Sequence, residues 1–202
     1  MGFSMGANTM LKYAGESKEN CLLEAIAALS CPFDIHLCIL NISKPQNKVV
    51  DFMLLQNSIR LLQRNKEMYE GLAHIDVEKA LQASSHYEFD EFFSRRAMGF
   101  TSPEHLYHTV SCAEDLKHIT VPVFALNALS DPVIPYFSRR EDCLPYSDFK
   151  TNPKLILVVS RHGGHLGWFT GIMKPKRVRI RQWYPYPAVE FLDYHLHTHP
   201  KP

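Results

Sequence analysis

The sequence is poor in cysteine and in net charge, and it has no long hydrophobic run. Its 202 residues include five cysteines, an odd number, and no two of them form a C-x-x-C pair. We therefore expect no disulfide framework, and a reducing compartment fits better. The net charge of +1 gives no global field that would attract nucleic acid or a membrane. Since no run is long enough to cross a bilayer and no signal-peptide pattern is visible, we expect a protein that is cytoplasmic or peripherally membrane-associated.

Motifs for cofactors and for nucleic acid are also missing. The chain contains no phosphate-binding glycine loop and no nucleic-acid-binding motif. Three histidines alternate near the C-terminus, His195, His197 and His199, but residues two apart do not share a helix face. We therefore expect no metal site, no cofactor and no nucleic-acid partner. What the sequence does contain is enough apolar material for one sizeable core, with 46% hydrophobic and 21% charged residues.

The first residues hold the pattern G-x-S-x-G, with Gly2, Ser4 and Gly6 in its fixed places. The pattern is typical of a nucleophile elbow, a sharp turn from a strand into a helix. A side chain at either glycine is expected to collide with the turn, and glycine removes that collision. We predict a helix over residues 7–15, which places the serine at a helix N-terminus, where backbone N–H groups stabilise an anion. An ordinary glycine-rich turn is the alternative interpretation of the same residues.

Three segments have the character of strands. The nearly continuous apolar run over residues 21–30 favours a buried parallel strand, although its leucines and alanines leave a helix as the alternative. Residues 121–127 and 153–160 are also predicted strands, the second being the clearest in the chain. Residues 187–197 have the pattern of a closing amphipathic helix. Strands and helices thus alternate, which predicts the α/β class with a mainly parallel sheet of three strands.

Residues 44–110 have a helical pattern instead of apolar strand-like runs, and they are predicted to form a helical insertion between strands. Apolar residues recur at helical spacing within residues 51–70, and we expect four of them to be buried: Phe52, Leu55, Ile59 and Leu62. Ser102 is predicted to cap a helix that starts at the following proline and reaches residue 110. Ser111 and Glu114 have the spacing of a capping box for the next turns of helix.

Ser4, Asp131 and His165 are the candidate catalytic residues. Asp131 and His165 each lie in a loop directly after a predicted strand, and sites in parallel sheets form at the carboxyl ends of strands. A histidine takes the proton of a serine hydroxyl and later protonates the leaving group, while an aspartate fixes the tautomer of the imidazole. The backbone N–H of Met5 is the candidate oxyanion donor. The alternatives are that Asp131 shapes a turn before Pro132 and that His165 is an ordinary loop residue.

Two histidines stand within four positions, and only one of them can be the base. His162 follows the end of the predicted strand, so we expect its side chain to pack or to form a local hydrogen bond. His165 follows Gly163 and Gly164, which allow the loop to turn back over the carboxyl ends of the strands. We therefore predict that His165 is the base.

Five segments are notable when they are taken together and in order: residues 2–8 (GFSMGAN), 32–34 (PFD), 87–90 (YEFD), 126–132 (LNALSDP) and 163–168 (GGHLGW). They resemble the YheT-like branch of the α/β-hydrolase superfamily, which includes the ABHD acylglycerol lipases and phospholipases. The resemblance implies a serine hydrolase of carboxylic esters that acts through an acyl-enzyme on acylglycerol or phospholipid acyl esters. It implies that Ser4, Asp131 and His165 form the triad and that residues 44–110 belong to a cap within a single domain, residues 1–202.

The start of the chain departs from that family. Met1 precedes the elbow motif directly, so we expect that the family's N-terminal part is missing, with its early strands and its second oxyanion donor. Ala7 stands where the family usually has a second glycine. The alternative function is therefore a catalytically silent, truncated remnant or a binding module of the same fold.

Basic residues crowd one stretch before Trp183 and Tyr184: Lys174, Lys176, Arg177, Arg179 and Arg181. Such a stretch is able to dock on an anionic lipid surface. A solvated loop is the favoured interpretation, because charge runs usually lie on solvent-exposed segments.

Overall fold

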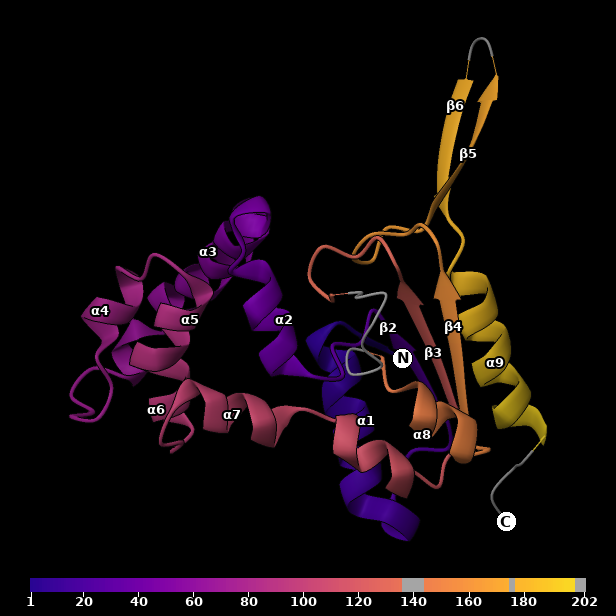
Figure 1. Ribbon diagram of the computed structural model, residues 1–202, viewed down its shortest axis with the longest axis horizontal. Helices are drawn as coiled ribbons and strands as arrows, with labels where there is room; N and C mark the ends of the chain where they lie inside the picture. The colour runs from indigo at the N-terminus through magenta and orange to yellow at the C-terminus, as the bar shows by residue number, and fades with distance from the viewer. Residues whose placement is uncertain (136–143, 175–176, 199–202) are drawn as a thin grey trace. The chain divides into compact units, whose positions relative to one another are not determined.

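The computed structural model describes residues 1–135, 144–174 and 177–198 (Figure 1). The chain divides into two compact units. The first comprises Met1–Asp34 and Ser111–Pro202, and the second comprises Ile35–Val110. The predicted insertion of residues 44–110 lies within the second unit, which also contains the helix α2 (Ile35–Ile42).

A parallel sheet forms the centre of the first unit, in the order β1-β2-β3-β4 among the described residues. The strands are β1 (Gly2–Phe3), β2 (Ile26–Leu29), β3 (Val123–Ala128) and β4 (Leu155–Ser160). The α/β class and the parallel sheet are confirmed. The expected number of three strands was wrong, because β1 has only two residues and so carries no periodic pattern. It pairs with β2 through Gly2 opposite Ala28 and Phe3 opposite Leu29.

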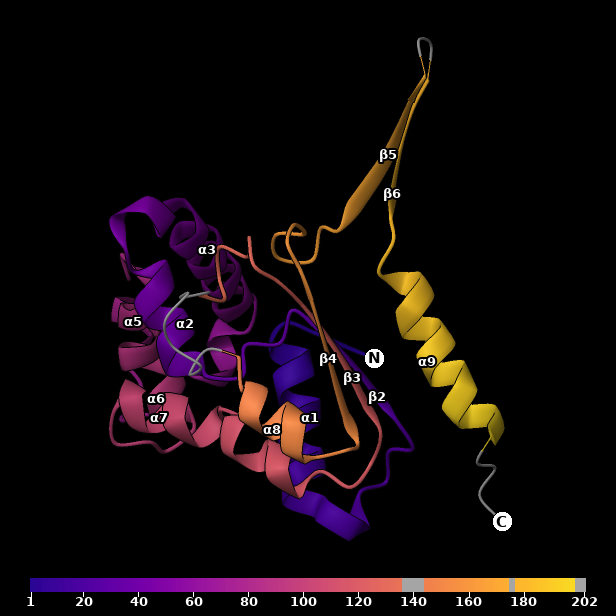
Figure 2. The ribbon, with the colours of Figure 1, turned by 45° about the vertical axis from the view of Figure 1, so that its right-hand side comes forward.

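Both faces of the sheet are covered, which explains why β2 and β3 are buried along their whole length. Figure 2 shows α9 (Pro185–Thr198) on one side and α1 (Met5–Ser17) and α8 (Tyr146–Thr151) on the other. Alternate residues of the strands point to these two sides. One apolar cluster contains Ile26, Ala28, Val123 and Ala125 with Leu11 of α1, and the other contains Ala27, Leu29, Phe124 and Leu126 with Ala188 of α9.

The predicted first helix and closing helix are confirmed, each slightly longer than expected. The run over residues 21–30 forms a strand only at Ile26–Leu29. This part of the run pairs with strands on both sides, with β1 on one and with β3 on the other.

The basic stretch near the C-terminus is not a loop, as we had favoured, but part of an antiparallel pair. β5 (Phe169–Lys174) and β6 (Arg177–Gln182) form a separate two-stranded sheet (Figure 1). The strand signal was an alternation of charged and apolar residues over Arg177–Gln182, which is the period of a strand. Five basic residues in one stretch obscured it.

The second unit is helical. After α2 it contains the following helices and helical turns: η2 (Pro45–Asn47), α3 (Lys48–Arg64), η3 (Lys66–Met68), α4 (Val77–Leu81), α5 (His86–Phe89), the π-helical turn η4 (Asp90–Ser94), α6 (Arg95–Ala97) and α7 (Pro103–Val110). Its apolar core contains Leu55, Ile59 and Leu62 of α3, with Val77, Ala80 and Phe89. The helical prediction for this region is confirmed, although the helices are shorter and more numerous than expected.

The prediction that Phe52 is buried was wrong, since this residue is 59% exposed. Asp51 takes the corresponding place on the buried side of α3 instead, with only 8% of its surface exposed. Its Oδ1 accepts a hydrogen bond of 3.0 Å from the backbone N–H of His86. The inward side of α3 thus carries a carboxylate that satisfies an N–H at the N-terminus of α5.

The two capping predictions had different outcomes. Ser102 caps α7, because its Oγ accepts a hydrogen bond of 3.2 Å from the N–H of His105. The capping box at Ser111 was wrong. The next helix, η5 (Ala113–His118), is a 3₁₀ helix whose N-cap is Cys112, with no side-chain capping bond, and the N–H of Ala113 donates instead to the carbonyl oxygen of Phe33.

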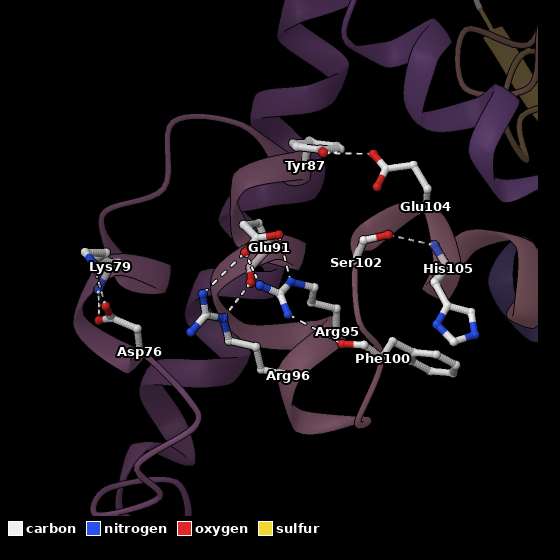
Figure 3. A network of polar contacts seen from close by, with 10 residues as sticks. All are labelled: Asp76, Lys79, Tyr87, Glu91, Arg95, Arg96, Phe100, Ser102, Glu104 and His105. Atoms are coloured by element: carbon white, nitrogen blue, oxygen red, sulfur yellow. Dashed lines mark hydrogen bonds and ion pairs between the residues drawn. The ribbon is translucent and has the colours of Figure 1, made fainter.

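Two ion pairs of the second unit converge on Glu91, which accepts hydrogen bonds from the side chains of Arg95 and Arg96 (Figure 3). Within the residues that the structure describes, no helix is long and apolar enough to span a bilayer.

Candidate active site

Ser4 lies at the turn between β1 and α1 with an unusual backbone conformation, φ 49° and ψ −123°. Its N–H donates to the carbonyl oxygen of Leu29, which continues the pairing of β1 with β2 into the turn. A Cβ at Gly2 would lie 2.8 Å from the Cα of Ala7, so glycine is required there. At Gly6 an added Cβ would meet no atom within 4 Å outside the helix's own backbone, so the collision predicted for Gly6 is absent. A non-glycine residue held at positive φ stores backbone strain, which clusters at functional sites.

Asp131 is fixed in the loop after β3, and its side chain is completely buried. Its Oδ1 accepts hydrogen bonds from the backbone N–H groups of Val133 (2.8 Å) and Ile134 (3.2 Å). Its Oδ2 lies 2.8 Å from Nδ1 of His165. The turn therefore orients the carboxylate and leaves one oxygen for the imidazole, so turn-shaping and a site role are not exclusive alternatives.

His165 joins the other two residues. Its Nε2 lies 2.8 Å from Oγ of Ser4, and its Nδ1 faces Asp131. The structure thus brings together three side chains from the start, the middle and the end of the chain, at the carboxyl ends of β1, β3 and β4. The arrangement allows proton transfer from a serine hydroxyl to an imidazole that a buried carboxylate orients. Their catalytic role stays a prediction.

The loop that carries His165 turns sharply after β4, and its glycines serve two different purposes. Gly164 has φ +57°, which favours a residue without a side chain. A Cβ at Gly163 would lie 2.3 Å from Nε1 of Trp168, so Gly163 allows the indole to pack closely. Trp168 is 1% exposed, and its Nε1 donates to Oγ of Ser160 at 2.8 Å. The buried indole anchors the loop.

His162 is exposed, which contradicts the expectation that its side chain packs. It is His165, not His162, that lies between Ser4 and Asp131. Met5 is the first residue of α1, so its backbone N–H has no carbonyl one turn earlier within the helix to donate to. The helix dipole adds a partial positive charge at this position, which favours an oxyanion there.

Sequence analysis missed the polar residues that support these loops. Nδ2 of Asn8 donates to the carbonyl oxygen of Pro32 (2.8 Å), and Nδ2 of Asn127 donates to that of Cys31 (3.1 Å). Both asparagines are 1% exposed, and together they hold the loop after β2. The signal that marks Asn127 is an amide within an otherwise apolar strand.

Ser130, beside Asp131, was also missed, and its Oγ accepts hydrogen bonds from the N–H groups of Gly163 and Gly164. Among the described residues no three histidine, cysteine, aspartate or glutamate side chains are grouped so that they could hold a metal ion.

The basic stretch is only partly described. Lys176 lies outside the described residues, as do the side chains of Lys174, Arg177 and Arg179, whereas Arg181 is exposed. The register of the hairpin pairs Thr170 with Arg181, Ile172 with Arg179, and Lys174 with Arg177. Because opposite residues of an antiparallel pair share a face, all the basic residues of β5 and β6 belong to one face.

The intervening register positions of the hairpin form the other face. There Phe169 is paired with Gln182, Gly171 with Ile180, and Met173 with Val178. The hairpin therefore has one basic and one mainly apolar face. Phe169 and Ile180 on the apolar face are 67% and 65% exposed.

Known proteins resemble most of the chain, although no family model matches it. Embryogenesis-associated protein EMB8 of Picea glauca is 30% identical over 174 residues, which cover 85% of this chain and 37% of that protein. Phospholipase ABHD3 of Bos taurus is 30% identical over 175 residues, covering 85% and 40% of the two chains. Monoacylglycerol lipase of Saccharomyces cerevisiae is 28% identical over 197 residues, covering 95% and 41%. The chain spans about two fifths of the length of these curated relatives.

Proposed function

The chain belongs to the α/β-hydrolase superfamily, in the branch of the ABHD lipases, and from this premise we propose that it is a serine hydrolase of carboxylic esters. The observation that carries the proposal is the line of two 2.8 Å contacts from Ser4 Oγ through His165 to the buried carboxylate of Asp131. A serine hydroxyl is a weak nucleophile until a base removes its proton, and this geometry supplies the base.

The reaction begins at Ser4. Its Oγ attacks the carbonyl carbon of the ester while Nε2 of His165 takes the hydroxyl proton. Asp131 accepts the Nδ1–H hydrogen bond and stabilises the imidazolium that results. The backbone N–H of Met5, at the start of α1, donates to the oxyanion of the tetrahedral intermediate.

Collapse of the intermediate breaks the bond to the alcohol oxygen, and His165 gives its proton to that oxygen. The acyl group is then held as an ester of Ser4. A water molecule, deprotonated by His165, attacks this acyl-enzyme, releases the carboxylic acid and returns the proton to Ser4.

The proposed substrates are lipid esters, namely acylglycerols or the acyl esters of phospholipids. The names of the relatives support this class, since they include a phospholipase and a monoacylglycerol lipase. Residues 44–110 are proposed to belong to the cap that the family resemblance implies.

The test of the hydrolase proposal is covalent labelling of Ser4 by a fluorophosphonate probe, together with turnover of a short-chain nitrophenyl ester. Ser4→Ala is expected to remove labelling and to lower kcat on the order of 10⁴–10⁶-fold, while the melting temperature stays nearly unchanged. Ser147→Ala, at an exposed serine of α8, is the matched control and should behave like wild type. Turnover by Ser4→Ala above that of a mock purification would contradict the assignment of Ser4 as the nucleophile. A wild-type protein that is not labelled would favour the silent remnant or binding module.

We further propose that the β5–β6 hairpin contacts an anionic lipid surface through its basic face. The register supports this contact, because Lys174, Arg177, Arg179 and Arg181 share one face. Each basic residue near such a surface contributes about 1 kcal/mol to binding.

Vesicle sedimentation tests this contact. The protein should bind vesicles of phosphatidylcholine with phosphatidylserine more tightly than vesicles of phosphatidylcholine alone. Arg181→Ala should weaken that binding about fivefold, whereas Arg60→Ala, at an exposed arginine of α3, should not. Equal binding to both kinds of vesicle, or equal effects of the two substitutions, would contradict the contact.

A further inference from the structure

We propose that Ser130 is a positioning residue that holds the His165 loop in register with the Asp131 loop. The proposal rests on the proposed function, since the geometry it protects is that of the Ser4–His165–Asp131 line. Its basis is a pair of hydrogen bonds: Oγ of Ser130 accepts from the N–H of Gly163 at 3.2 Å and from the N–H of Gly164 at 3.1 Å.

The loop after β3 and the loop after β4 are therefore joined by two neighbouring sets of contacts. Ser130 and Asp131 are adjacent in one loop, and Gly164 and His165 are adjacent in the other. Ser130 binds the backbone of the second loop, while Asp131 binds the imidazole of His165. The contact between Asp131 and His165 would by itself allow the imidazole to rotate about that hydrogen bond. The contact of Ser130 with the neighbouring backbone restricts this rotation.

The His165 loop behaves as a small closed unit, so holding one part of it holds the imidazole. The N–H groups of Gly167 and Trp168 both donate to the carbonyl oxygen of Gly163, each at 3.0 Å. Leu166 and Trp168 have positive φ values of 69° and 41°, a strained conformation that needs outside support to persist.

That support comes from two anchors on opposite sides of His165. The downstream anchor is Trp168, whose buried indole donates to Oγ of Ser160, the last residue of β4. The upstream anchor is Ser130. Since Trp168 is buried in the core of the first unit, its removal is expected to destabilise the fold as well as the loop.

Ser130 is exposed, which separates its effect on the loop from any effect on stability. Without its hydroxyl, the N–H groups of Gly163 and Gly164 can donate to water, so unfolding is hardly favoured. The position of the imidazole relative to Ser4 does change. A shift of about 1 Å in a reacting group is enough to cost up to about 100-fold in rate.

The test compares Ser130→Ala with Ser130→Thr, which keeps the hydroxyl, and with Ser147→Ala as a matched exposed control. Ser130→Ala should lower kcat and the rate of fluorophosphonate labelling about tenfold, with KM and the melting temperature close to wild type. Ser130→Thr should restore both rates to within about twofold, and Ser147→Ala should not change them. A purely structural role would move the melting temperature and would not leave KM unchanged.

A second readout does not depend on turnover. The proton between Nδ1 of His165 and Asp131 should give a downfield NMR signal that broadens or disappears in Ser130→Ala and returns in Ser130→Thr. If the wild-type protein is not labelled, the proposed hydrolase function fails, and the NMR signal still decides the positioning role. Wild-type rates in Ser130→Ala, or an unchanged NMR signal in that variant, would overturn the proposal.

Discussion

Each of the two units contains a histidine beside an aspartate, and the two pairs differ in how their carboxylates are used. In the first unit, Oδ2 of Asp131 lies 2.8 Å from Nδ1 of His165, and the residues come from two loops that are 34 positions apart. In the second unit, Oδ2 of Asp90 lies 3.8 Å from Nε2 of His86, one helical turn earlier. The first imidazole reaches a serine, whereas Asp90 is engaged by Tyr107.

Tyr107 donates a hydrogen bond of 2.8 Å to the same Oδ2 of Asp90. Burial raises the pKa of Tyr107 far above its usual value, and the neighbouring Asp90 raises it further. The oxygen that faces His86 is therefore already the acceptor of a buried hydroxyl. A buried histidine–aspartate pair therefore indicates proton transfer only where the other imidazole nitrogen faces a nucleophile.

The largest effect that would test this comparison is the loss of a histidine. His165→Ala should abolish ester turnover, with kcat lower on the order of 10⁴–10⁶-fold. His162→Ala should lower kcat/KM less than about tenfold, which is under 1.4 kcal/mol of barrier. Measured kcat/KM on a nitrophenyl ester decides between them. An inactive His162→Ala protein beside an active His165→Ala protein would reverse the assignment.

The next largest effect distinguishes the two aspartates, Asp131 and Asp90. Asp131→Asn keeps the shape of the side chain but presents an amide to Nδ1 of His165, which favours the wrong tautomer. We expect kcat to fall about 10⁴-fold. Asp90→Asn should leave kcat within about twofold, because this carboxylate accepts from Tyr107 of the second unit, whereas His165 faces Asp131. Equal losses of kcat in the two variants would show that the pairs are not distinct.

Tyr107→Phe tests the structural role of the second pair. It removes the hydroxyl that satisfies the buried Asp90, so the free energy of unfolding should fall by about 1–3 kcal/mol. Tyr87→Phe is the matched control, since Tyr87 also donates to a carboxylate, Glu104, but at an exposed position (Figure 3). Its expected cost is under about 0.5 kcal/mol. Denaturant unfolding measures both, and a larger loss in Tyr87→Phe would contradict the ranking.

The raised pKa of Tyr107 also predicts a pH dependence. The folded state keeps this proton above pH 10.0, the usual value, whereas the unfolded state loses it. Stability should therefore fall as the pH rises above about 10, and Tyr107→Phe should weaken that fall.

The smallest expected effect lies in the partly buried ion pairs of Glu91 with Arg95 and Arg96 in the second unit. The hydrogen bond from Arg95 lowers the pKa of Glu91, and Arg96 lowers it further (Figure 3). A carboxylate whose pKa is lower in the folded state stabilises the fold at pH values above its unfolded-state pKa. This contribution is lost as the pH falls through the folded-state pKa. In Glu91→Gln the free energy of unfolding should therefore decline less steeply below about pH 4.5 than in the wild-type protein. The difference between the two proteins should be less than about 1 kcal/mol. An unchanged acid profile would show that this cluster contributes nothing measurable.

The sequence indicated much of the fold through local patterns. The apolar runs gave β3 and β4 within two residues of their ends. The helical spacing gave the buried residues Leu55, Ile59 and Leu62 of α3. The sequence patterns did not reveal β5 and β6, because the basic residues of Arg177–Gln182 obscured the alternation of β6 and β5 has no clear alternation.

Phe52 shows where such patterns fail. Its spacing fits the apolar side of α3, but Asp51 is buried instead because it satisfies the N–H of His86 in α5. Periodicity within one helix contains no information about an unsatisfied donor on another. The same limit explains the error at Ser111, where a tertiary hydrogen bond from Ala113 to Phe33 accompanies a later helix start.

Local patterns identified the residue types that are available for chemistry: a serine in an elbow motif, an aspartate and a histidine after strands, and a glycine pair before the histidine. The folded chain was needed to show that Oγ of Ser4 and Nε2 of His165, 161 positions apart, lie 2.8 Å from each other. It also brought Oγ of Ser130 within hydrogen-bonding distance of the N–H groups of Gly163 and Gly164. The physical reason is that residue patterns report local conformation, whereas a site depends on how parallel strands bring their carboxyl ends to one edge and on the hydrogen bonds that fix the loops there.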